Sequence, residues 1–414
     1  MQSGNCYKFS LALLALCMLG ATAHPANADT PSYTIIDLGT ISNVPGEVGT
    51  LGSFANGINN SGQVVGFGNK SRSYLGFRTA PNSPINQATD DLGSLGGNSP
   101  FGPDTRAFGI NKSGQVVGFS YRPPQIRSQN QQEAFRTAPN SPINPATDDL
   151  GVLGGISSRA SSASGINNSG QVVGSSTTDI GEGHAFRTAP NSPINPATDD
   201  LGTLGGTYSN AKAINQSGRV VGYSTTDSGE THAFRTARNQ AINPATDNLG
   251  TLGGTSSYAL GINKLGRVVG YSTTPNGETH AFRTARNRAI NPATDDLGTL
   301  GGTSSEALGI NRLGQVVGYS TTASGETHAF LYDVSGHLVD LNSLISPDSP
   351  SNFSVLTRAT AINDRGQIVG YGTISNGCQP SCSSHPYPDT RAFLATPVNT
   401  NEVTTQSAQS PNED

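Results

Sequence analysis

The 414-residue sequence has few charged and few aromatic side chains. It has no Trp, and Asp, Glu, Lys and Arg together make up 13% of the chain. Disordered chains are rich in charge, so this shortage, together with β-branched pairs such as Val172-Val173, indicates a folded protein. The 24 Lys and Arg residues are scattered and the formal net charge is −5. This excludes a basic stripe for nucleic acid or for an anionic membrane surface.

Long apolar runs are also missing. The run Phe9–Leu19 is too short to span a bilayer, which takes about 20 residues. Lys8 precedes it and the small-residue site Ala26-Asn27-Ala28 follows it, which is the pattern of a secretory signal peptide. We therefore expect residues 1–28 to be a signal peptide, and we expect a secreted or periplasmic protein without a membrane span.

Cysteine is equally scarce. Cys6 and Cys17 lie in the predicted signal peptide, which leaves Cys378 and Cys382 in the mature chain. An even pair in an exported protein predicts a disulfide, here closing a small loop. A metal site that includes the nearby His385 is the alternative, but three ligands in one loop are incomplete for structural zinc. We expect no cofactor.

What the sequence has in abundance is internal repetition. The phrase [GA]-I-N-x-x-G-[QR]-[VI]-V-G occurs seven times, at intervals of 48 to 56 residues. Its asparagines are Asn59, Asn111, Asn167, Asn215, Asn263, Asn311 and Asn363. We interpret them as Asx-turn or positive-φ residues of a hairpin turn, with a ligand role as the less favoured alternative.

One repeat unit resolves into four short strands with turns between them. Around Asn263 the predicted strands are Tyr258–Asn263, Arg267–Thr273, Thr279–Ala285 and Thr294–Leu300. Four strands in about 48 residues is the size of a β-propeller blade. Blades packed on both faces also explain the adjacent apolar residues. The sequence therefore predicts an all-β fold, a seven-bladed β-propeller over residues 29–397, followed by a disordered polar tail at 398–414.

Covarying residues test the pairing of the third and fourth strands. In five units, the residue that follows Phe in the third strand is Arg, and the residue that precedes the Asp-Leu segment of the fourth strand is Asp. This predicts cross-strand ion pairs. These pairs are Arg78 with Asp90, Arg136 with Asp148, Arg187 with Asp199, Arg235 with Asp247, and Arg283 with Asp295. In the sixth unit both change, to Leu331 and Val339. Leu394 of the seventh unit meets an apolar partner, Ile36, only if the N-terminal strand joins the last blade and closes the ring.

The repeated motifs resemble those of the HAF-repeat family of extracellular bacterial repeat proteins. The resemblance rests on four His-Ala-Phe segments, together with D-L-G-T-L-G-G and G-I-N-x-x-G-x-V-V-G, and covers about residues 33 to 397. The segments begin at His184, His232, His280 and His328. In the other units Leu75, Glu133 and Arg391 stand in place of the histidine, and Gly76 stands in place of the alanine in the first unit. The resemblance implies export and a repeat architecture, and it brings no catalytic activity or ligand residues.

Two kinds of residue are candidates for a site. The four equivalent histidines favour a hairpin-packing or surface role, with a ring-shaped binding site as the alternative. We interpret paired acids such as Asp199-Asp200 as residues that support strand ends, with calcium binding as the less favoured alternative. Neighbouring strand residues point to opposite faces, so the two carboxylates do not face one ion. Two unique insertions are where individual function is expected, although tolerated surface loops also explain them. These insertions carry Arg122 and Arg127, and His385 and Tyr387.

No catalytic motif is apparent. There is no G-x-S-x-G, P-loop or H-E-x-x-H segment. We therefore expect a monomeric binding or interaction module for extracellular glycans or envelope proteins. The alternatives are a secreted hydrolase or lyase with its site on one face, and a structural matrix protein. A deep pocket with acids from non-equivalent units would favour an enzyme, and shallow equivalent pockets would favour a multivalent binder.

Overall fold

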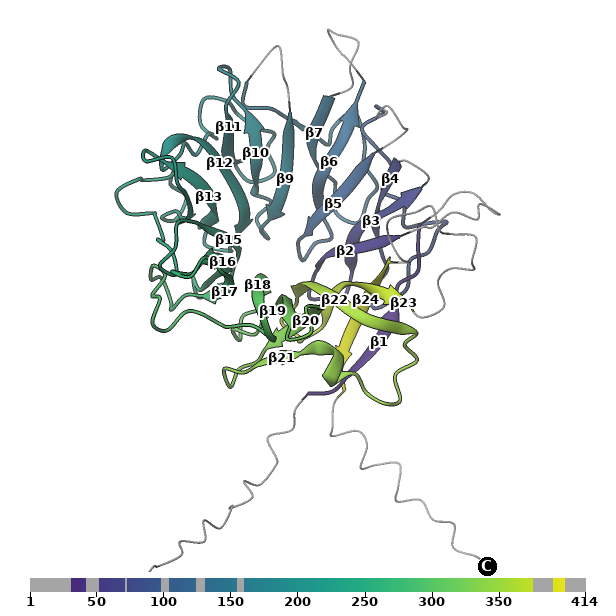
Figure 1. The fold of residues 1–414 in the computed structure, drawn as a ribbon. Helices are drawn as coiled ribbons and strands as arrows, with labels where there is room; N and C mark the ends of the chain where they lie inside the picture. Colours follow the sequence, from purple (N-terminus) through teal and green to yellow (C-terminus); the bar gives the residue numbers. More distant parts are fainter. Residues whose placement is uncertain are drawn as a thin grey trace, which may run out of the picture. The chain divides into compact units, whose positions relative to one another are not determined.

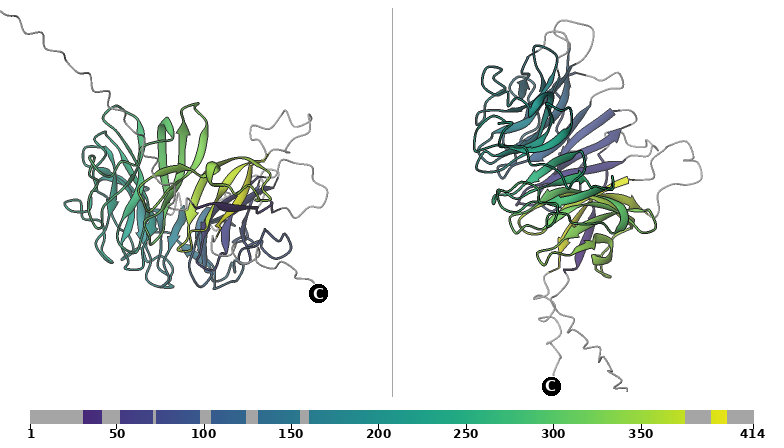
Figure 2. Two further views of the ribbon diagram at one scale, coloured as in Figure 1. Left: turned by 90° about the horizontal axis from the view of Figure 1, so that it is seen from below. Right: turned by 60° about the vertical axis from the view of Figure 1, so that its left-hand side comes forward.

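Three consecutive antiparallel strands form the common part of all seven repeat units. The computed structural model describes residues 31–41, 52–70, 73–97, 104–123, 131–154, 160–374 and 390–398. Contacts separate Met1–Pro31 from one compact unit, Ser32–Asp414, to which the account below applies. Neighbouring strands of a repeat lie side by side in chain order (Figure 1 and Figure 2).

The repeats are called units 1 to 7 in chain order, and their strands have the following bounds. They are β2 (Ser53–Ile58), β3 (Val64–Lys70) and β4 (Ser73–Arg78) in unit 1; β5 (Thr105–Ile110), β6 (Val116–Arg122) and β7 (Gln131–Arg136) in unit 2; β9 (Ser161–Ile166), β10 (Val172–Thr177) and β11 (Gly183–Arg187) in unit 3; β12 (Gly205–Ile214), β13 (Val220–Thr226) and β14 (Thr231–Arg235) in unit 4; β15 (Ser257–Ile262), β16 (Val268–Thr273) and β17 (Thr279–Arg283) in unit 5; β18 (Gly301–Ile310), β19 (Val316–Thr322) and β20 (Thr327–Tyr332) in unit 6; and β22 (Phe353–Ile362), β23 (Ile368–Ile374) and β24 (Thr390–Pro397) in unit 7.

Burial on both faces of each sheet explains why the strands contain adjacent apolar residues. In unit 3, Val172 packs into a cluster with Val117 of unit 2, whereas Val173 packs into a cluster with Val220 of unit 4. Successive strand residues point to opposite faces, so each valine serves a different junction. The core therefore lies between neighbouring units. A phenylalanine such as Phe234 is fully buried there, which stabilises the fold by about 1.5–3 kcal/mol relative to exposure.

The prediction of seven four-stranded blades closed into a propeller is wrong. The described strands form six sheets: three of three strands, two of four and one of seven, which runs from β15 to β21. Units 5 and 6 share the seven-stranded sheet through a parallel bridge between Thr279 and Ser304. None of these described sheets closes on itself, so seven-blade closure is not supported.

The expected fourth strand is reduced to a single bridge in four units, for example between Phe234 and Asn248 in unit 4. The Asn248 side chain then accepts a hydrogen bond from the Gly250 amide, and Gly250 has a φ of 72°. The same turn occurs at Asp149 in unit 2, where the short strand β8 (Asp149–Gly151) forms, so the turn does not by itself remove the strand. Among the described residues, fourth strands are β8, β21 (Leu338–Asp340), which precedes the short helix η1 (Leu341–Leu344), and the N-terminal strand β1.

The N-terminal strand pairs where the covariation places it. β1 (Tyr33–Asp37) lies antiparallel to β24, and Ile36 is opposite Leu394 (Figure 1). In unit 6, Leu331 is likewise opposite Val339. The order of this sheet is β1-β24-β23-β22, so the first strand of the described chain completes the last unit.

Candidate functional site

The turn between the first two strands of each unit is an Asx turn. In unit 3, Oδ1 of Asn167 accepts hydrogen bonds from the amides of Ser169 (3.1 Å) and Gln171 (3.0 Å). The Asx-turn interpretation of the seven asparagines is therefore confirmed. The positive φ falls instead on the glycine three residues later, such as Gly170 at 81°.

The seven turn asparagines also connect the units, which the sequence analysis missed. In unit 3, Nδ2 of Asn167 donates to the backbone oxygen of Asn215 in unit 4, at 3.3 Å. The same bond recurs at each step along the chain, and Asn363 donates to the backbone oxygen of Asn59 at 3.1 Å. This asparagine series links turns and not sheets. Each asparagine side chain therefore fixes both its own turn and the position of the next turn.

A second loop lies beside each turn and follows the third strand. Asn239 in this loop of unit 4 has a φ of 53°, and its Oδ1 accepts a hydrogen bond from Nε2 of Gln171 in unit 3, at 3.3 Å. The same bridge joins Gln115 to Asn191, at 3.2 Å. We call the surface formed by these turns and loops the asparagine end.

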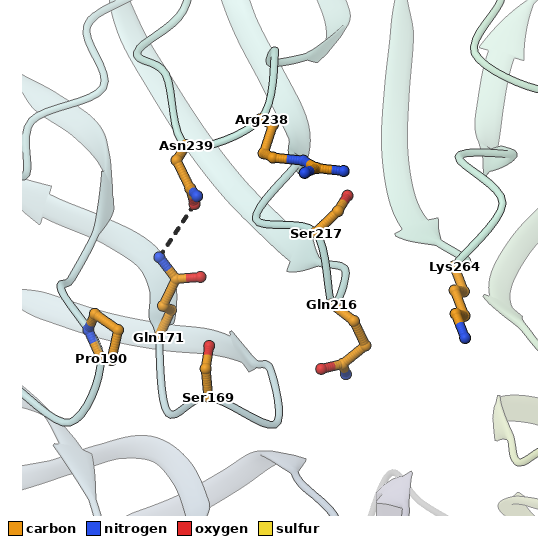
Figure 3. A pocket seen from close by; sticks show the side chains of 8 residues that line it. All are labelled: Ser169, Gln171, Pro190, Gln216, Ser217, Arg238, Asn239 and Lys264. Atoms are coloured by element: carbon orange, nitrogen blue, oxygen red, sulfur yellow. Dashed lines mark hydrogen bonds between the residues drawn. The ribbon is translucent and has the colours of Figure 1, made fainter.

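The asparagine end carries an open pocket where units 3, 4 and 5 meet (Figure 3). Its volume is about 660 Å³. The residues that line it are Ser169, Gln171, Pro190, Gln216, Ser217, Arg238, Asn239 and Lys264. Arg238 and Lys264 are exposed, and neither side chain has a hydrogen-bond or ion-pair partner among the described residues. We call this site the basic pocket.

The preceding junction carries an equivalent pocket of about 530 Å³, which we call the amide pocket. Its lining residues are Ser113, Gln115, Arg136, Thr137, Ala138, Pro139, Thr147, Asp148, Asn168 and Asn191. Its two charged side chains are already engaged, because Nη1 of Arg136 donates to the Ser192 backbone oxygen (3.0 Å) and Asp148 accepts from the Asn144 amide (2.8 Å). Its available groups are therefore amides and hydroxyls.

The predicted ion pairs between Arg and Asp do not form as such. The strands are neighbours, since the Arg136 amide donates to the Asp148 backbone oxygen at 3.0 Å. The guanidinium instead reaches the next unit, and the same holds for Arg78, Arg187, Arg235 and Arg283. Burial lowers the pKa of Arg136, and the charge of Asp148 partly opposes this effect. The arginines thus connect units, and the aspartates cap their own loops.

The histidines lie toward the opposite ends of the strands from the asparagine end. Nδ1 of His184 is 2.9 Å from Asp200, and its Nε2 is 3.5 Å from Glu182. The hydrogen bond to Asp200, more than any other contact, raises the pKa of His184. The same arrangement surrounds His280 and His328, whereas Asn248 replaces the aspartate beside His232.

The structure does not bring the four histidines together. Each contacts side chains of its own unit, and no group of three or more metal-ligating side chains is present in the part of the chain that the structure describes. In unit 2, Glu133 occupies the histidine position, and Arg122 contacts both Glu133 and Asp149. Arg122 is therefore engaged in a local charge network. Arg127, His385, Tyr387 and the predicted disulfide between Cys378 and Cys382 lie outside the described residues, as do the predicted signal peptide and nearly all of the tail.

The two pockets offer hydrogen bonding and positive charge. Neither contains a histidine, a cysteine or a pair of carboxylates, so their described residues are suited to holding a polar ligand. Across the described residues, no helix is long and apolar enough to cross a membrane.

One family model matches part of the chain. Residues 207–385 match the model of a family described as a protein of unknown function, DUF3466. A search of curated proteins found no match. Similar solved structures include the lectin BP39L from Burkholderia pseudomallei, with 12% identity, a TM-score of 0.37 and coverage of 79% of this chain and 93% of the lectin.

Two further solved structures are similarly distant. The lectin of Aleuria aurantia, described as a six-bladed β-propeller that recognises fucose, has 9% identity and a TM-score of 0.34, and covers 70% of this chain and 93% of its own. A GH62 hydrolase in complex with xylotriose has 10% identity and a TM-score of 0.29, with 88% and 96% coverage. All three structures are thus distant from this chain in sequence and in backbone.

Proposed function

We propose that this protein is a secreted, multivalent binding module for extracellular glycans. The observation that supports this most directly is the recurrence of an open, polar pocket at equivalent junctions of the repeat. Ser169 and Gln171 of the basic pocket have counterparts in Ser113 and Gln115 of the amide pocket. Hydroxyl and amide groups at the rim of a shallow pocket match the hydroxyl groups of sugars.

Repetition adds affinity when the ligand also repeats. A polysaccharide offers identical groups at regular intervals, so a second pocket on the same molecule binds at a high effective concentration. Membership of the HAF-repeat family and export through the segment 1–28 are part of the same proposal. The repeated His-Ala-Phe segments and the pattern of Lys8, the apolar run and Ala28 support them.

Glycan-array screening of the mature protein tests the function. We expect binding to at least one class of extracellular polysaccharide. Ser169→Trp should fill the basic pocket without unfolding the protein, because the equivalent turn positions of later units hold Leu265 and Leu313. Ser113→Trp is the matched variant for the amide pocket. Absence of binding to every glycan, or binding that neither variant alters, would contradict the proposal.

A further inference from the structure

The basic pocket differs from the amide pocket at two equivalent positions. Arg238 stands where the loop of the preceding unit has Pro190, and Lys264 stands where the preceding turn has Gln216. Both cations are exposed, and neither is neutralised by a carboxylate in the described part of the chain. Figure 3 shows the turn that carries Gln216 and Ser217 between the loop of Arg238 and the turn of Lys264.

The lysine also leaves a backbone amide without its usual acceptor. At the two preceding steps, the amide after the turn asparagine donates to a side chain of the next unit: Lys112 to Oδ1 of Asn168 at 3.1 Å, and Asn168 to Oε1 of Gln216 at 3.0 Å. The equivalent donor in unit 4 is the Gln216 amide, and the residue at the acceptor position is Lys264. An ammonium group has only donors. The Gln216 amide accordingly has no acceptor among the described residues.

Three kinds of donor thus border one pocket: a guanidinium, an ammonium and an unpaired backbone amide. Such donors favour anionic ligand groups along the pocket, since hydrogen bonds between ionised donors and a carboxylate are shorter and stronger than neutral ones. The positive character continues in the following units, where Arg286 and Arg312 occupy the positions of Arg238 and Lys264. Arg219 replaces the glutamine seen at Gln171.

We propose that the basic pocket binds the carboxylate of an acidic polysaccharide, a polymer that contains uronic acid. This inference rests on the proposed function and names its ligand class. The neutral donors Ser217, Gln216 and Gln171 would hold the sugar hydroxyls beside the carboxylate. A nucleic acid fits less well, because no aromatic side chain lines the pocket to stack on a base.

Isothermal titration calorimetry with two matched probes tests the inference. The first probe is an oligogalacturonic acid, and the second is the same oligomer with its carboxyl groups reduced to alcohols. We expect the wild type to bind the acid at least about tenfold more tightly than the reduced form at low salt, and this preference should shrink at high salt. The double variant Arg238→Gln/Lys264→Gln should lose this preference.

A control variant separates the pocket from general electrostatics. Lys112→Gln/Arg365→Gln removes the same charge from two exposed turn residues that line neither pocket, and it should change the affinity by less than about twofold. Equal binding of the acidic and reduced oligomers would overturn the inference and leave glycan binding intact. No binding of either oligomer or of any arrayed glycan would overturn the proposed function itself. Tighter binding of a DNA oligonucleotide, lost in the Arg238→Gln/Lys264→Gln variant, would overturn the assignment to an acidic glycan.

Discussion

The basic pocket and the amide pocket have the same architecture and different charge. Both are formed by Asx turns and Asn-containing loops of successive units, and the bridge from Gln171 to Asn239 in one matches the bridge from Gln115 to Asn191 in the other. Pro190 and Gln216 in the earlier repeat correspond to Arg238 and Lys264 in the later one. The comparison shows that the repeat holds the scaffold constant while exposed loop positions vary, which is where binding specificity usually resides.

The scaffold is most sensitive at the asparagine that serves both pockets. Asn167→Ala removes the hydrogen bonds to the Ser169 and Gln171 amides and to the Asn215 backbone oxygen, along with two side-chain hydrogen bonds in the turn, and it leaves part-buried backbone groups unpaired. We expect a loss of about 2–4 kcal/mol in the free energy of unfolding, measured by chemical denaturation. Binding at both pockets should weaken together. A stable variant in which only one pocket is affected would show that the two pockets do not share this support.

The difference between the pockets should be transferable. In the Arg238→Gln/Lys264→Gln background, Pro139→Arg/Asn168→Lys places both cations at the same loop and turn positions of earlier units, on residues that line the amide pocket and not the basic pocket. Arg and Lys already occur in these loop and turn positions in later units, so the fold should tolerate them. We expect about tenfold recovery of oligogalacturonate affinity in calorimetry, equivalent to about 1.4 kcal/mol. No recovery in a folded protein would mean that charge is not what distinguishes the pockets.

The shared bridges should have small and equal effects. Gln115→Ala and Gln171→Ala each remove one amide hydrogen bond between units. Each should cost about 0.5–1.5 kcal/mol in the free energy of unfolding, the usual contribution of such a bond. Denaturation curves of the two variants should nearly coincide. A clear difference would show that the pockets differ in scaffold as well as in charge.

The histidines should affect stability without affecting the pockets. Asp200 and Glu182 face His184, and the pKa of His184 is raised from its ordinary 6.5, first because of the hydrogen bond to Asp200. Folding therefore favours the protonated form. The resulting stabilisation is complete below about pH 6.5 and is lost as the pH rises through the folded-state pKa.

Thermal melts of the wild type and of His184→Gln across this range measure the contribution. The wild type should become less stable relative to the variant as the pH rises. Oligogalacturonate affinity should stay constant over the same range, because neither pocket contains a histidine. Parallel changes in stability and affinity would connect the histidines to the site.

Local patterns in the sequence were sufficient to predict the common strands. The predicted strands around Asn263 agree with β15, β16 and β17, because β-branched runs and Gly-containing turns act locally. The pairing of Ile36 with Leu394 followed from covariation. The fourth strand was predicted wrongly: in four units the expected segment makes a single bridge to the third strand.

The candidate site was beyond local patterns. The basic pocket combines residues from three units, and sequence spacing does not show which loops meet. The asparagine series had a visible signal, an invariant side chain at seven equivalent turns. Its second bond could not be predicted, because the Asx turn already explained each asparagine. Charge covariation likewise predicted ion pairs, whereas the half-buried guanidinium groups donate to carbonyl oxygens of the next unit.

Hydrogen–deuterium exchange with and without oligogalacturonic acid tests the central claim most directly. We expect protection of the turn at Asn215–Arg219 and of the loop that carries Arg238 and Asn239, and no comparable protection at Asn111–Gln115. The Gln216 amide should show the largest change, because it would gain an acceptor. Protection confined to the segments around His184 and Asp200, or no protection anywhere at saturating ligand, would contradict the account.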